Sequence, residues 1–441
     1  MLKAPRHAFL FLSLPLLLLF PVSAPAQLDK TFSGIFTEIL DVRLQRSGSP
    51  GQHGTHFLES AERANSELVP ALNSLIAGNV SSYPLSSTST GALFDFSTGV
   101  PIPIAASSGP IFAETAKPLG KSKFLLEANY TYAQLTQFRG LATEDMAFTF
   151  THRDVTNDGT LGQNPNESDL LNLALDLHAS VGIGVIFATY GVTSNFDVSV
   201  ALPIVSVQLN GTASASIDSY TFGRLGHANH LFGGDTLHPV LVTSVPYSHS
   251  ATGLGDVALR LKYGFTRGGA LDAAALADVR FPTGKKADFL GTGKATFRIW
   301  GILSRPFGDL TPHLNLGYAW RTGELQSNAF EFRAGFDNKL YSSLTFALDV
   351  LGQINLDDSE AIHLAPGSVL VADQAPGADA ARVVRLSNVP DRSNDNIISL
   401  SVGLRFAPSG TLNMFGNVFV PLNDGGLRAT VAPTIGMSLM F

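Results

Sequence analysis

Residues Leu427–Phe441 read LRATVAPTIGMSLMF, and their pattern decides the fold class. The odd-numbered positions are apolar throughout, whereas most even-numbered positions, beginning with Arg428, carry small or polar side chains. A period of two residues is typical of a β-strand, because successive side chains point to opposite faces. The stretch is also longer than the five or six residues of an average strand, which is typical of a strand that crosses a lipid bilayer.

The other end of the chain has the pattern of a secretory signal peptide. Lys3 and Arg6 precede an apolar run that begins at Ala8, and Ala24-Pro25-Ala26 provides a cleavage site. We expect residues 1–26 to be removed, and no later segment is apolar for the ~20 residues of a spanning helix. A signal peptide together with an aromatic last residue, Phe441, predicts a protein of the bacterial outer membrane. Its partners would be outer-membrane lipids and the barrel-assembly machinery, which would recognise the last strand.

The composition excludes several classes of protein. The 441 residues include only 15% charged residues, 42 glycines and 30 phenylalanines against two tryptophans, which suits a barrel in lipid better than a soluble protein of this size. The formal charge of -7 argues against binding to nucleic acid. The chain has no cysteine, so disulfides, thiol catalysis and thiolate metal sites are excluded.

The same alternation recurs upstream and predicts an all-β fold, a transmembrane antiparallel β-barrel over 111–441. One face of the segment 171–187 carries an apolar side chain at every odd position, from Leu171 to Phe187, and we expect such apolar faces to point to lipid. The predicted strands number twelve: 121–135, 171–191, 195–209, 254–266, 270–283, 294–305, 310–321, 327–338, 341–354, 395–407, 410–421 and 427–441. A further short pair at 111–117 and 144–152 would raise the count to fourteen.

The connections between these strands alternate in length, which predicts the topology. Short turns such as 408–410 are expected in the periplasm, and the long connections 136–170, 210–253, 284–293 and 355–394 outside the cell. Tyr318 and Trp320 fall at the outer end of their strand, where an aromatic girdle belongs.

Charged residues on the faces opposite to lipid are candidates to line the lumen. The bases exceed the acids, which would favour anionic solutes such as carboxylates; alternatively, the charges pair into a network that holds the barrel shape. The candidates are Asp256, Arg260, Lys262, Asp278, Arg280, Arg298, Glu331, Arg333, Asp349, Arg405 and Arg428, and the same faces carry Asp272, Lys294 and Arg321.

Residues 27–110 do not alternate and form a separate N-terminal segment. Phe57, Ala61, Ala64, Leu68, Leu72, Leu75 and Ile76 have helical spacing, and Gly78 would end the helix. Two interpretations remain open: a periplasmic, partly disordered extension, or a plug that folds back into the lumen of a barrel wide enough to need one.

Three stretches resemble the outer-membrane family of the MetA pathway of phenol degradation, itself similar to the outer-membrane fatty-acid-transporter family. They are FAETAKPLGK at 112–121, ATYGVT at 188–193 running into DVSVALPI at 197–204, and TGLGDVALRLKY at 252–263. The resemblance spans 111–441 and its motifs are structural. It implies uptake of hydrophobic or aromatic compounds and supplies no catalytic residue or cofactor.

No catalytic, metal or cofactor site is predicted. Asp154–Gly159 resembles the start of a calcium loop, but Pro165 stands where its twelfth ligand, a glutamate, belongs, so an exposed turn is favoured. His227, His230, His238 and His249 lack ligand spacing and are interpreted as solvated. A barrel phospholipase would need a lipid-facing Ser–His pair, whereas His178 and His313 are expected to face inward.

Three functions remain open. The first is passive uptake of small hydrophobic or aromatic compounds, which the family resemblance favours. The second is a general pore for polar solutes, which requires 27–110 to lie outside the lumen. The third is a structural or surface role without transport, in which side chains seal the lumen.

Overall fold

The computed structural model describes residues 27–37, 45–46, 57, 66, 68–82, 94–95, 102–103, 109–266, 271–322, 327–356, 367–372, 381–391 and 395–441. The expected signal peptide and two positions of the expected helix, Ala61 and Ala64, lie outside these residues. Among the described helices, none is long and apolar enough to cross a bilayer.

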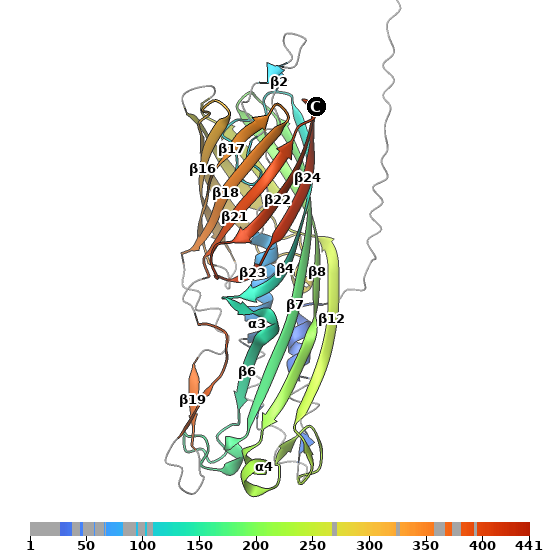
Figure 1. Ribbon diagram of the computed structural model, residues 1–441, viewed down its shortest axis with the longest axis vertical. Helices are drawn as coiled ribbons and strands as arrows, with labels where there is room; N and C mark the ends of the chain where they lie inside the picture. Colours follow the sequence, from blue (N-terminus) through green and yellow to red (C-terminus); the bar gives the residue numbers. More distant parts are fainter. Residues whose placement is uncertain are drawn as a thin grey trace, which may run out of the picture.

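Twelve antiparallel strands close into a barrel, which confirms the predicted fold class and strand count (Figure 1). Each strand pairs with the next in order around the barrel, and closure comes from pairing of the last strand, β24, with the first, β4. The strands are β4 (Phe124–Phe138), β7 (Leu170–Gly191), β8 (Phe196–Asp218), β13 (Ala258–Gly264), β14 (Asp272–Arg280), β15 (Thr296–Ser304), β16 (Leu310–Arg321), β17 (Ala329–Tyr341), β18 (Leu344–Asn355), β21 (Ile397–Phe406), β22 (Leu412–Pro421) and β24 (Ala432–Met440).

Two sequence predictions about individual strands were wrong. The fourteen-strand alternative fails because 111–117 is not a strand and β6 (Met146–Thr151) pairs with β7 beside the barrel, not in it. The C-terminal strand is also broken, since β23 (Leu427–Ala429) and β24 are separate and the register shifts between Arg428 and Ala429. This shift turns Leu427 inward, where it is buried, so the apolar face is not continuous from Leu427 to the end.

β7 and β8 continue well past the barrel and form a four-stranded sheet with β6 and β12 (Val242–Leu254), in the order β6-β7-β8-β12. We call this sheet the extension; it lies at the end away from the C-terminus (Figure 1). Much of the expected loop 210–253 is therefore strand, because β8 runs on to Asp218 and β12 returns beside it. Within this sheet, the inner faces of β7 and β8 form the apolar surface on which the N-terminal helices pack.

Short elements complete the chain. Near the tip of the extension lie α4 (Tyr220–Leu225) and the hairpin of β19 (Ser368–Val371) and β20 (Arg382–Arg385) (Figure 1). The remaining elements are β1 (Gln45–Arg46), β2 (Phe94–Asp95), β3 (Ile102–Pro103), β5 (Leu141–Ala142), β9 (His230–Leu231), β10 (Gly233–Gly234), β11 (Pro239–Val240) and the 3-10 turns η3 (Thr143–Asp145), η4 (Pro165–Ser168) and η5 (Lys286–Asp288).

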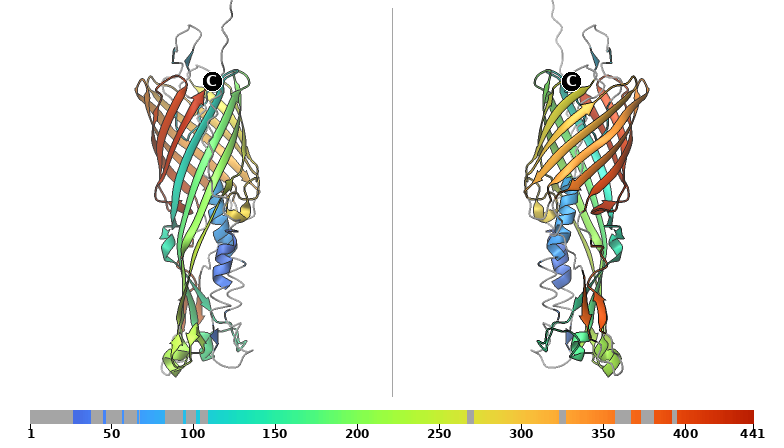
Figure 2. Two further views of the ribbon diagram at one scale, coloured as in Figure 1. Left: turned by 90° about the vertical axis from the view of Figure 1, so that its right-hand side faces the viewer. Right: turned by 90° about the vertical axis from the view of Figure 1, so that its left-hand side faces the viewer.

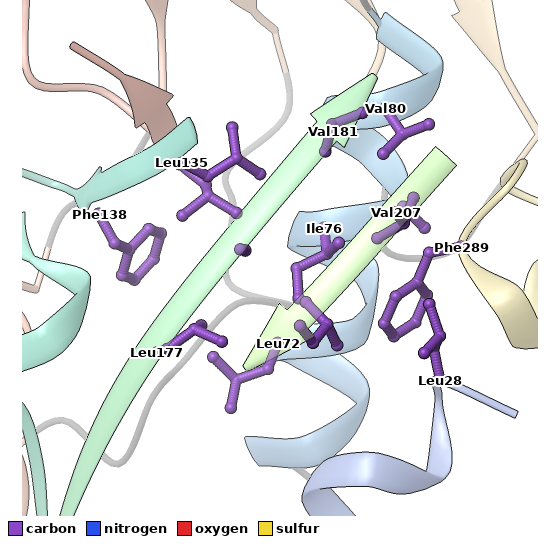
Figure 3. Close-up of a cluster of buried hydrophobic side chains, with 14 of the residues drawn as sticks. Leu28, Leu72, Ile76, Val80, Leu135, Phe138, Leu177, Val181, Val207 and Phe289 are labelled. Carbon is purple, nitrogen blue, oxygen red and sulfur yellow. The ribbon is translucent and has the colours of Figure 1, made fainter. Parts of the chain in front are cut away.

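Helices α1 (Lys30–Thr37) and α3 (Val69–Ser82) pack against one face of the extension, below the barrel (Figure 2). Leu72, Ile76 and Val80 recur every four residues, so they share one helix face, and this face is buried against β7 and β8 (Figure 3). Full burial of each such side chain contributes about 1.5–3 kcal/mol. The helix continues through Gly78, so the predicted stop at that residue was wrong.

The polarity of the two sheet faces inverts along β7 and β8. Near the C-terminal end of the barrel, the outer face of β8 carries the exposed Val200 and Leu202 and the partly exposed Val198. Beyond Ile204 the same outer face carries Ser206 and Gln208, while the inner face becomes apolar. On β7 the change falls at the paired positions Gly184 and Gly182. The outer face is thus apolar where lipid surrounds the barrel and polar where water surrounds the extension.

This inversion corrects the prediction that every apolar face points to lipid. The odd positions of 171–187 are buried and face inward, and Leu177 and Val181 among them lie beside α3 (Figure 3). Their opposite face carries His178, whose side chain is 57% exposed, so His178 points outward and not into the lumen.

Exposed aromatic residues mark both borders of the lipid-facing band. Near the C-terminus the outward rings include Phe124, Tyr190, Tyr263, Phe265, Phe406 and Phe441. Toward the extension they include Tyr130, Tyr132, Phe281, Phe297 and Trp320. Two aromatic girdles around an apolar band are typical of outer-membrane barrels, and Trp320 confirms the girdle expected at its strand end, where its ring lies 4.4 Å from that of Tyr318.

Candidate functional site

The charged residues that the sequence assigned to the lumen lie on the inward faces of the barrel strands or at their ends. Ten of the eleven candidates are buried and Arg333 is partly buried. Asp256 stands at the rim, where its carboxylate accepts hydrogen bonds from the Gly284 and Thr292 amides and so holds the connection 284–293. Lys294, also expected inside, is exposed in that connection instead.

A segment that precedes the first strand occupies part of the lumen. We call Pro110–Leu119 the luminal segment; it is not a strand, yet most of its side chains are buried. Glu114, at its centre, lies 2.6 Å from Arg260 and 3.4 Å from Lys262. Asn315 fixes the Glu114 backbone by bonding both its amide, at 2.6 Å, and its carbonyl, at 3.0 Å. The segment is therefore held by paired charges and hydrogen bonds across the barrel.

Two further carboxylates organise the arginines on the neighbouring strands β13 to β17. Asp278 lies 3.2 Å from Arg260, 3.6 Å from Arg280 and 3.5 Å from Arg298. Glu331 lies 3.3 Å from Arg298 and 3.3 Å from Arg321. Each acid is thus shared between two or more bases, because the bases on this wall outnumber the acids.

A second cluster of charges lies apart from this wall. The imidazole of His313, which faces inward as expected, lies 2.5 Å from Asp349 and 3.4 Å from Asp337. Arg405 donates to the carbonyl of Pro110 at 2.8 Å and lies over the Phe415 ring, so it also anchors the luminal segment. Asp349 and Arg405 therefore have structural partners of their own.

An open cavity of about 930 Å³ lies inside the barrel between the luminal segment and α3. Asn79 of α3 lines it, while two other lining residues, Arg333 and Phe419, contact Phe112 of the luminal segment. One wall carries Arg280, Arg298, Glu331, Arg333 and Trp300. The facing wall is mostly apolar and consists of Ala133, Leu135, Phe419, Leu427 and Ala432.

Arg333 and Trp300 form one unit in the charged wall. The guanidinium carbon of Arg333 lies 4.6 Å from the centre of the Trp300 ring, at cation–π distance. Trp300 in turn covers Gly317, where even a methyl group would collide with the indole. Sequence reasoning missed Trp300, although alternation places it on the same face as Arg298. It also missed Glu114, whose segment does not alternate and therefore gave no signal.

One expectation about the loops was wrong, and another agrees with the structure. His230 is buried and its Nδ1 lies 2.7 Å from Asp169, so it is not a solvated loop histidine. The carboxylate of Asp154 accepts the Gly159 amide at 2.7 Å within an exposed turn, and this hydrogen bond lowers the pKa of Asp154. Elsewhere, Glu144, Asp176 and the outward His178 lie close enough together to hold an ion, on the outer surface.

The closed barrel, its apolar belt with two aromatic girdles and its polar, charge-lined interior define an outer-membrane β-barrel protein of bacteria. A family model described as "Putative MetA-pathway of phenol degradation" matches residues 154–368. The match confirms the resemblance found in the sequence, although the stretch 112–121 lies outside the matched residues.

Comparison with solved structures finds other barrels at low identity. An outer membrane channel from Pseudomonas putida F1 is 9% identical, with a TM-score of 0.41, over 74% of this chain and 98% of that one. A FadL homologue from Pseudomonas aeruginosa is 10% identical, with a TM-score of 0.31, over 73% and 90%. The toluene transporter TbuX from Ralstonia pickettii is 10% identical, with a TM-score of 0.25, over 73% and 89%. No curated protein matches the chain.

Proposed function

We propose that this protein is an outer-membrane channel for the passive uptake of small hydrophobic or aromatic compounds. The cavity inside the barrel carries the proposal, because it is a concave site that combines apolar walls with a few polar groups. The description of the matching family, phenol degradation, supports an aromatic solute. The fold is that of channels and transporters, and the proposal assigns no catalytic step to it.

We further propose that the N-terminal segment acts as a plug of the lumen, and not as a periplasmic extension. Helix α3 supports this role because Asn79 lines the cavity and donates a hydrogen bond to the carbonyl of Leu427 on the barrel wall. The helix is held to the extension by apolar contacts and takes no part in the strand pairing that closes the barrel. At the other end, pairing of Phe441 with Phe124 presents a complete last strand that the assembly machinery would recognise.

Planar-bilayer conductance tests the plug. We expect a small conductance for the full-length protein and a larger one for L72D/I76D, because two buried carboxylates would release α3 from the apolar surface of the extension. The control is S74D, which changes a partly exposed position of the same helix. Large conductance in all three proteins favours a general polar-solute pore, and conductance in none favours a structural role.

Uptake by intact cells tests the solute class. A deletion strain should take up limiting phenolic and other aromatic compounds more slowly than the parent, and the wild-type gene should restore the rate. Uptake of small sugars should not change, since a plugged lumen does not serve them. A strain that loses sugar uptake but takes up every aromatic compound normally contradicts the proposal.

A further inference from the structure

The charges that line the cavity are unbalanced. Four arginines, Arg280, Arg298, Arg333 and Arg428, line it together with one acid, Glu331. Glu331 is shared by Arg298 and Arg321, and Asp278 beside the cavity is shared by Arg260, Arg280 and Arg298, so the bases of this wall still outnumber its acids. Inside a barrel, where walls of protein and lipid replace water, such an excess produces a strong positive potential. The cavity therefore favours an anion over a neutral molecule of the same shape.

Arg333 is the arginine best placed to bind that anion. Among the described residues it makes no direct ion pair: it contacts the Phe112 carbonyl and the Trp300 ring, while Glu114 and Glu331 act on it only at longer range. These two contacts hold the guanidinium at a fixed place without neutralising it. A partly buried cation that has no directly bonded counter-charge costs free energy, and a carboxylate that supplies two parallel hydrogen bonds lowers that cost.

Arg428 adds a second cation from the far side of the cavity. Its guanidinium donates to the Asn423 side chain at 2.9 Å, to the Ile398 carbonyl at 3.0 Å and to the Ser399 hydroxyl at 2.6 Å. These hydrogen bonds orient the guanidinium of Arg428 at the edge of the cavity.

The remaining surface of the cavity selects for an apolar body. Leu135, Phe419 and Leu427 face the arginine wall, and each is buried. A hydrated inorganic anion gains nothing from such a wall, whereas a hydrocarbon ring gains from the removal of apolar surface from water. The open space between the two walls, about 930 Å³ with the solvent at its mouth included, leaves room for a single ring with its carboxylate.

We propose that the cavity is a binding site for aromatic carboxylates, with the carboxylate at Arg333 and the ring against Leu135, Phe419 and Leu427. This inference rests on the proposed channel function and names the solute class that the channel takes. It also gives a role to the arginine excess that a purely structural network does not explain, since such a network would be balanced.

The two tryptophans provide a direct measurement of binding. Trp300 lines the cavity and Trp320 lies on the outer face, so W320F leaves the cavity residue as the sole tryptophan. In detergent at neutral pH, benzoate should shift the Trp300 emission saturably, with an affinity at least tenfold higher than that of benzamide. The two ligands have nearly the same shape and differ in charge, and a hydrogen-bonded ion pair accounts for about a tenfold difference or more.

Variants locate the site. R333Q in the W320F background should abolish the preference for benzoate, while R333K should retain part of it. The matched control is R305Q, which removes an exposed arginine that lies over Phe307 in a turn outside the cavity. Assembly of each variant is checked by heat-modifiable migration on gels. The comparison of benzoate with benzamide is made on the W320F protein, in which Arg333 is unchanged. It therefore tests the proposed site even if R333Q does not assemble.

Each outcome separates this inference from the channel function. Equal affinities for benzoate and benzamide, or binding of neither, refute the inference even if aromatic compounds still enter cells through the protein. Displacement of benzoate by inorganic phosphate at equal concentration refutes the claim that the apolar wall selects an aromatic ring. A clear benzoate preference without uptake in cells supports the site and refutes the proposed channel.

Discussion

Arg139 shows how single residues hold the end of the barrel nearest the extension. It has a positive φ of 52° and is buried, and its guanidinium makes two parallel hydrogen bonds of 2.9 Å to Asp395. Asp395 also accepts the Gly426 amide at 3.1 Å. One ion pair therefore joins three connections that are far apart in the sequence.

Replacement of Arg139 should be costly because it leaves a buried carboxylate without its partner. We expect R139M to lower the free energy of unfolding by about 3–5 kcal/mol, measured by urea unfolding in lipid vesicles. The double variant R139M/D395L should recover much of the loss, since it removes both charges. A single variant within about 1 kcal/mol of the wild type would show that the pair behaves as an exposed one.

At the scale of elements, β7 and β8 each pass from lipid into water along their length. The outer face of β8 carries Val200 in the band that faces lipid and Gln208 on the extension, which faces water. The border between them falls at Ile204 and Ser206 and is matched on β7 by Gly184 and Gly182. The outer side chains of both neighbouring strands therefore change polarity at the same level, which marks the boundary of the lipid.

Arginine scanning along one face of β8 tests this boundary. V200R should destabilise the barrel by about 2–4 kcal/mol, because it places a charge near the middle of the apolar band. Q208R, on the same face of the same strand, should change stability little, because its side chain remains in water. Unfolding in lipid vesicles measures both, and equal effects would mean that the extension also lies in the membrane.

The elements show which part of the fold the sequence could predict. Alternation located the twelve strands, because each strand separates two faces of different polarity. It could not tell which face meets water, and on β7 Leu177 faces inward, toward α3 (Figure 3). The partners of Arg260 were equally hidden, since Glu114 lies 146 residues away on a segment without periodicity. Alternation did place Arg298 and Glu331 on inward faces, where the structure also places them.

The whole molecule is asymmetric about the membrane, with short turns at one end and the extension at the other (Figure 1). An epitope tag inserted after Gly226, at the end of α4, should be detected on intact cells, because the extension is expected outside. A tag at Ser409, in the turn between β21 and β22, should be detected only after the cells are broken. Detection of the second tag alone on intact cells would reverse the topology.

The closure of the barrel has a mechanical consequence. β24 pairs with β4 through seven residues and β23 adds three beyond a register shift, whereas β7 and β8 pair through 22 residues. Under a pulling force at the C-terminus, hydrogen bonds break one pair at a time, and the load falls first on β24, the strand that carries the C-terminus. In single-molecule force spectroscopy the barrel should therefore unzip from β24 backwards, and the β7–β8 hairpin should rupture late, as the longest extension step of the trace.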